Sequence, residues 1–139
     1  MNKYFPVYAA ILGVLALLLF LSPQIAKFIS ADTAIIGAEI LKNRVKIGKI
    51  KYAMFSGRFL RKMKKEPDEV DLLVVGNIVL PELALLVREE EKRLNTEINY
   101  TVMTEEEFSF RRKKRDPFII SILAGSRVVL IGDEETMLS

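Results

Sequence analysis

The feature that most constrains this chain is an uncharged, apolar stretch near its N-terminus. Residues 4–26 carry no charged side chain, and residues 9–21 are apolar throughout. With the aromatic residues just before it, the apolar run reaches roughly 20 residues, the length that crosses a hydrocarbon core. Pro6 falls where the first turn of a helix tolerates proline, and Pro23 falls where the helix is expected to stop. The sequence therefore predicts a long apolar helix that anchors the chain in a membrane through residues 4–22.

The charges around this helix predict its orientation. Only Lys3 precedes it, whereas several cations follow it, namely Lys27, Lys42, Arg44, Lys46, Lys49 and Lys51. By the positive-inside rule, we expect a single-pass membrane protein whose C-terminal part is cytoplasmic. Two alternatives stay open. One is a cytoplasmic protein with this helix buried in its core, and the other is a cleaved signal peptide, although the run exceeds the usual apolar length of such peptides.

The remainder of the chain has the pattern of a small α/β domain, so we divide the chain into residues 1–30, the anchor, and residues 31–139. Strands are predicted over residues 49–55, 70–75, 98–103 and 127–131, and helices over residues 33–46, 81–94 and 117–123, with another opening at Thr104. The second strand is apolar almost throughout, which indicates a central position, and Gly76-Asn77 is expected to end it. The predicted fold class is α/β, with a small mixed sheet of about four strands and flanking helices.

Composition limits the chemistry that this domain can perform. The chain contains no cysteine and no histidine, which excludes a disulfide framework, a thiol nucleophile, an imidazole base and the usual zinc sites. Catalysis would have to use carboxylates, hydroxyls, lysine or arginine, and a bound metal would need oxygen ligands, which suits Mg²⁺.

Two acidic residues at the start of the second strand form the candidate site. Glu69 and Asp71 are two positions apart on an extended chain, so their side chains are expected on the same side of the sheet. Two carboxylates placed in this way can share Mg²⁺ beside a substrate phosphate. Ser56, at the end of the first strand, and the backbone N–H groups next to it could hold that phosphate.

This arrangement resembles the minimal nucleotidyltransferases of the polymerase-beta superfamily. Their motif is a hydrophobic strand ending in Gly-Ser, a short spacer, and Asp-x-Asp followed by an apolar strand; the similarity extends over about Lys49 to Glu135. The resemblance implies a nucleotidyltransferase-like fold. It also implies nucleotide contacts from Ser56, Gly57 and Arg58, and catalytic and Mg²⁺-binding roles for Glu69 and Asp71.

The chain departs from the family motif in three places. Ser56-Gly57 reverses the order of the family's Gly-Ser, and Glu69 replaces the first aspartate. The later strand, where active members usually place a third carboxylate, has no acid and offers Asn99, Tyr100 and Thr101. Phosphoryl transfer needs several fixed oxygen ligands around its metals. We therefore expect a catalytically degenerate domain with a nucleotide- or protein-binding regulatory role and no necessary cofactor.

Two alternative functions stay open. One is an active transferase that uses Mg²⁺ to move a nucleoside monophosphate from a nucleoside triphosphate to a protein or small-molecule hydroxyl, as in the family's antitoxins. The other is a regulator that associates with nucleic acid through basic residues 58–65 and 111–115. The sequence alone leaves open whether the chain is an enzyme.

Overall fold

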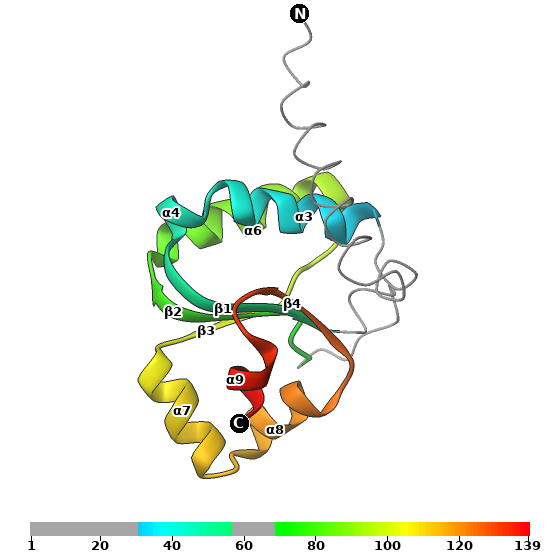
Figure 1. Ribbon diagram of the computed structural model, residues 1–139. Coiled ribbons are helices and arrows are strands. Elements are labelled where there is room, and N and C mark those ends of the chain that lie inside the picture. Colours follow the sequence, from blue (N-terminus) through cyan, green and yellow to red (C-terminus); the bar gives the residue numbers. More distant parts are fainter. Residues whose placement is uncertain (1–30, 57–68) are drawn as a thin grey trace, which may run out of the picture.

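A computed structural model describes residues 31–56 and 69–139, which form a four-stranded sheet with helices on both of its faces (Figure 1). The strands are β1 (Gly48–Ser56), β2 (Leu72–Ile78), β3 (Tyr100–Met103) and β4 (Arg127–Ile131). The helices are α3 (Ala31–Lys42), α4 (Arg44–Ile47), α6 (Leu80–Leu94), α7 (Glu105–Lys113), α8 (Pro117–Ala124) and α9 (Glu134–Leu138).

The sheet is mixed, with strand order β3-β2-β1-β4. Strand β1 runs antiparallel to both of its neighbours, β2 and β4, whereas β2 and β3 are parallel. The parallel pair is joined through α6, since a parallel connection has to return to the same end of the sheet. The predicted α/β class, the mixed four-stranded sheet and the flanking helices are confirmed.

Alternating side chains of the central strands build a core on each face of the sheet. In Figure 1, α3, α4 and α6 lie above the sheet and α7, α8 and α9 lie below it. The upper cluster consists of Ile36, Ile40, Ile47, Phe55, Leu72, Val74, Leu83, Leu86, Val87 and Ile98. The lower cluster consists of Tyr52, Met54, Leu73, Val75, Met103, Phe108, Ile119 and Met137. Strand β2 contributes to both clusters, which confirms its predicted central position.

Gly76 does not end β2 as predicted; the strand continues through it to Ile78. Its φ of 152° belongs to a region that side chains disfavour, and a Cβ atom at this position would lie 2.1 Å from the carbonyl oxygen of Lys49. The register between the strands shifts at this point, because Ile50 pairs with Gly76 while Tyr52 pairs with Val75. The glycine therefore accommodates a β-bulge in β1 and does not end the strand.

Two helix predictions need correction. The single helix predicted over residues 33–46 is divided at Asn43, whose side-chain amide donates a 2.8 Å hydrogen bond to the carbonyl oxygen of Glu39. The backbone N–H of Asn43 donates to the same oxygen at 3.1 Å, so the side chain adds a second donor at the residue that separates the two helices. Helix α9 was not predicted, because its five residues are too few for a periodic signal.

The predicted anchor, residues 1–30, lies outside the residues that the structure describes. Among residues 31–56 and 69–139, no helix has both the length and the apolar character needed to cross a membrane.

Candidate functional site

The end of β1 and the start of β2 are neighbours, as the predicted site requires. Phe55 of β1 pairs with Leu72 of β2, and the backbone N–H of Ser56 donates a 2.9 Å hydrogen bond to the carbonyl oxygen of Asp71. Ser56 and Asp71 are thus brought together across adjacent strands. Gly57 and Arg58, the other predicted nucleotide contacts, lie outside the described residues.

Asp71 is buried, with 1% of its surface exposed. Its Oδ2 accepts a 2.8 Å hydrogen bond from the backbone N–H of Asn99. The backbone N–H of Asp71 in turn donates to the carbonyl oxygen of Asn99 at 2.7 Å. Asp71 therefore joins three segments, because its main chain bonds to Ser56 and both its main chain and its side chain bond to Asn99.

Asn99 also contacts the second predicted acid. Its side-chain amide donates a 3.1 Å hydrogen bond to the carbonyl oxygen of Glu69, whose side chain is half-buried. A single asparagine thus holds the main chain on both sides of Val70. In this way the backbone leading into β2 is fastened to the residue that precedes β3.

Asn99 is the residue of this site to which sequence reasoning gave no role. It was noted only because its strand lacks an acid. The signal that could have found it is the register of β2 and β3: Leu72 pairs with Tyr100, so Asp71 falls beside Asn99. That register depends on how α6 returns the chain to the sheet, and the sequences of the separate strands do not determine it.

The predicted metal ligands of this site are Glu69 and Asp71. Within the described part of the chain, no three acidic side chains gather closely enough to form a metal centre. One Asp71 oxygen already accepts the Asn99 amide proton. A carboxylate placed in this way can hold two strands together, and a metal would have to use its remaining oxygen lone pairs.

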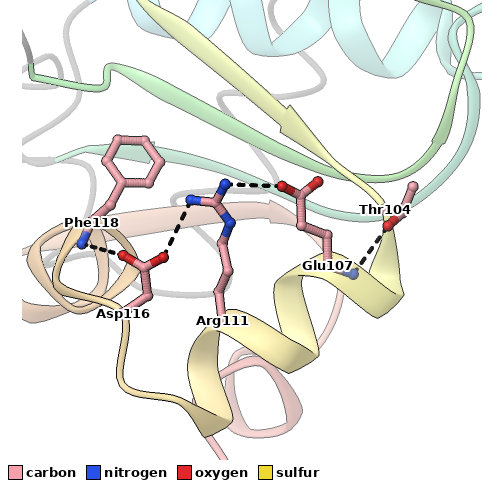
Figure 2. Close-up of polar contacts among 5 residues, drawn as sticks. All are labelled: Thr104, Glu107, Arg111, Asp116 and Phe118. Carbon is pink, nitrogen blue, oxygen red and sulfur yellow. Dashed lines mark hydrogen bonds and ion pairs between the residues drawn. The ribbon is translucent and has the colours of Figure 1, made fainter.

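The second basic cluster, residues 111–115, lies at the end of α7 and in the turn before α8. Figure 2 shows Arg111 between two carboxylates, 3.1 Å from an oxygen of Glu107 and 3.4 Å from an oxygen of Asp116. Asp116 caps α8 by accepting a 2.9 Å hydrogen bond from the N–H of Phe118. Arg111 therefore has a structural role, since it connects the two helices.

The next cation of the cluster, Arg112, has a structural role as well. It donates hydrogen bonds to the carbonyl oxygens of Met137, at 2.6 Å, and Thr136, at 3.1 Å. By contrast, Lys113, Lys114 and Arg115 are exposed and form no ion pair with any residue in the described ranges. Three of the five cations are therefore available to a ligand.

A shallow depression of about 460 Å³ lies at the C-terminal end of α6, apart from the predicted site. Its lining carries both signs of charge and consists of Arg88, Glu91, Lys92, Asn95, Thr96 and Glu97. Because the lining includes neither Ser56 nor the two predicted acids, the depression does not extend the candidate site.

Comparison of the chain with protein-family models, with curated proteins and with solved structures finds no match.

Proposed function

We propose that this chain is a nucleotidyltransferase-like domain that has lost nucleotide transfer and acts as a regulatory module that binds a nucleotide or a partner protein. The proposal depends above all on Asp71, the only one of the two motif acids that is the same here as in the nucleotidyltransferase family. Its carboxylate is buried and accepts the backbone N–H of Asn99. One of its lone pairs is thus used by the sheet, while the other two carboxylates expected of an active member are changed, as Glu69, or absent, so few oxygen ligands are left for metal-dependent transfer.

Other features support a retained binding role. Ser56 and Asp71 lie on adjacent strands, joined by a backbone hydrogen bond, so the nucleotide-contacting and acidic ends of the motif still meet. Asn99, which lies beside both predicted acids, carries no charge at neutral pH. The site is therefore less negative than a site with three carboxylates, and a triphosphate would be repelled less without metal.

The experiment that tests the proposal separates binding from transfer. The full chain, purified in a mild detergent, is incubated with ATP labelled at the α-phosphate, Mg²⁺ and an extract of the cells that encode it. We expect no labelled protein. Calorimetric titration of the same chain with ATP is expected to give binding that persists when EDTA removes Mg²⁺.

Neutral variants serve as the matched controls. Glu69→Gln and Asp71→Asn retain the shape of each side chain and remove its charge. Binding by the module should survive in Glu69→Gln. If labelling instead occurs, requires Mg²⁺ and disappears in both variants, the chain is an active transferase and the proposal is wrong. If no nucleoside triphosphate gives heat, the nucleotide-binding form of the proposal is wrong.

For location, we propose that residues 4–22 anchor the chain in a membrane with the α/β domain on the cytoplasmic side. The support is the uncharged run and the excess of cations after it. The expressed chain should sediment with membranes and resist extraction by alkaline carbonate. Release into the supernatant would favour the alternative of a cytoplasmic protein.

A further inference from the structure

Helix α7 presents an exposed stripe on the side that faces away from the core. Phe108 is buried, with its ring 5.7 Å from the ring of Tyr52, so this side of the helix packs against the sheet. Phe110, two positions later, points to the opposite side, and 62% of its surface is exposed. Residues three and four positions apart are neighbours on a helix surface. Glu106 and Lys114 therefore flank Phe110 along this stripe, one on each side.

The two charges of this stripe belong to Glu106 and Lys114. Glu106 and Lys114 are exposed, and neither forms an ion pair with any residue in ranges 31–56 and 69–139. Lys114 follows the last residue of α7 and keeps a helical conformation, with φ of −78° and ψ of −5°. Its amino group lies 5.8 Å from the centre of the Phe110 ring. The stripe thus consists of an acid, an exposed aromatic ring and a base, in that order.

This order is self-complementary. Glu106 and Lys114 lie four positions before and four positions after Phe110. A second α7 helix placed antiparallel, with the two-fold axis at Phe110, would bring each Glu106 to the Lys114 of the other copy. Both aromatic rings would then be buried at the centre of the contact. Two-fold contacts require a surface patch that is complementary to itself.

We propose that α7 is the contact through which two copies of this chain associate, with the helices antiparallel and Phe110 on the two-fold axis. The mixed charge of the stripe favours a second copy over an anionic membrane or a nucleic acid. Either of those ligands would attract Lys114 but would be repelled by Glu106. Because α7 has nine residues, the contact is small and belongs to the weak, transient class of interfaces.

Disulfide trapping tests the geometry. The chain has no cysteine, so Phe110→Cys introduces a single thiol at the proposed axis. In the full chain, mild oxidation should give a disulfide-linked dimer on a non-reducing gel, because residues at the axis come within disulfide distance. The matched control is Leu85→Cys, a half-exposed position on α6, which lies on the other face of the sheet (Figure 1). We expect cross-linking of the control to be at least about tenfold slower, because Leu85 lies outside the proposed contact and the two thiols would meet only in random collisions.

Charge reversal tests the pairing with Phe110 intact. In sedimentation equilibrium of the full chain, Glu106→Lys and Lys114→Glu should each weaken self-association by about tenfold, because each places like charges opposite each other twice. An equimolar mixture of the two variants, and also the double variant, should recover association, because both restore opposite charges. Glu105→Lys changes the net charge equally but lies off the stripe, so it should have little effect.

Three results would overturn the proposal. The first is equal cross-linking of Phe110→Cys and Leu85→Cys. The second is a mixture of the two charge-reversed variants that associates no better than either variant alone. The third is a chain that shows no such pairing and whose binding to an oligonucleotide, or whose preference for phosphatidylserine vesicles over neutral vesicles, is lost in Lys114→Glu. Circular dichroism of each variant verifies that the domain remains folded.

Discussion

Removing the Asp71 carboxylate should destabilise the domain, since this side chain fastens β2 to the residue before β3. The acid is 1% exposed and accepts the Asn99 N–H at 2.8 Å. A hydrogen bond to a charged group contributes about 1.5–3 kcal/mol, and its loss leaves a backbone donor without an acceptor. We therefore expect Asp71→Ala to lower the free energy of unfolding by about 1.5–3 kcal/mol.

The measurement is urea unfolding of the full chain in detergent, with circular dichroism as the signal that reports unfolding. For a domain of this size, such a loss moves the urea midpoint by about 1–2 M. Asp71→Asn retains an oxygen that can accept the same N–H but loses the charge, so it should destabilise less, by about 1 kcal/mol. The exposed Glu89→Gln is the control, and its effect should stay within about 0.5 kcal/mol.

A local measurement separates this hydrogen bond from a general loss of packing. Amide exchange at Asn99 should accelerate more in Asp71→Ala than exchange at Met54 in the lower core, because only Asn99 loses its acceptor. An Asp71→Asn variant as stable as the unchanged chain, or more stable, would refute the reasoning. Such a result would mean that the buried Asp71 carboxylate lowers the stability of the domain, and a group that is kept although it destabilises the fold is typical of a functional site.

Three further predictions concern the bulge, a helix cap and the C-terminal helix. Gly76→Ala should cost about 2 kcal/mol or more, because a Cβ atom at φ 152° would collide with a carbonyl oxygen. Thr104→Ala should cost about 1 kcal/mol, because the Thr104 hydroxyl caps α7. The Thr136 hydroxyl, followed by the backbone N–H of Glu135, lowers the pKa of Asp133, so the stabilisation that Asp133 gives to α9 should decline as the pH falls below the ordinary value of 3.8 and through the lowered folded pKa.

Matched variants and opposing outcomes accompany these predictions. Gly125→Ala, with open space around the new Cβ atom, should leave urea stability almost unchanged, and an equal loss at both glycines would contradict the steric argument. Thr104→Ser should keep the cap of α7, so a loss equal to that of alanine would exclude the hydroxyl as its source. For Asp133, NMR titration should show its pKa rising toward the ordinary value in Thr136→Val; an unchanged pKa would rule out that hydrogen bond as the main cause.

The sign of the Asp133 effect follows from its hydrogen bonds. They favour the charged carboxylate in the folded chain, so the folded pKa lies below the unfolded one. The stabilising contribution is complete above the unfolded pKa and disappears as the pH falls through the folded pKa. Because Met137 of α9 is fully buried against the lower core, loss of this cap should loosen that cluster first.

The predicted strands and helices that the structure bears out share one property, which is that their signals are local. The β4 segment, residues 127–131, was predicted with its observed bounds, and the capping pattern that begins at Thr104 does open α7. The single helix predicted over residues 33–46 and the strand end predicted at Gly76-Asn77 were wrong. At Gly76 a distant contact decides the outcome, because the paired strand β1 makes the glycine part of a bulge. At Asn43 the break between α3 and α4 is local, and both the backbone N–H and the side-chain amide of Asn43 donate to the carbonyl oxygen of Glu39.

The candidate site also has features that local sequence predicted and features that only the tertiary structure revealed. The sequence alone singled out Glu69 and Asp71 by their two-residue spacing, which is a short-range property. The resemblance implied that Ser56 lies beside them, and the pairing of β1 with β2 brings Ser56 and Asp71 together. Only the tertiary structure showed that Asp71 binds the backbone of Asn99, a residue 28 positions away. Such a contact depends on strand order and register, which arise when all the apolar faces are buried together. Local sequence patterns do not determine strand order or register, because both depend on contacts between residues far apart in the chain.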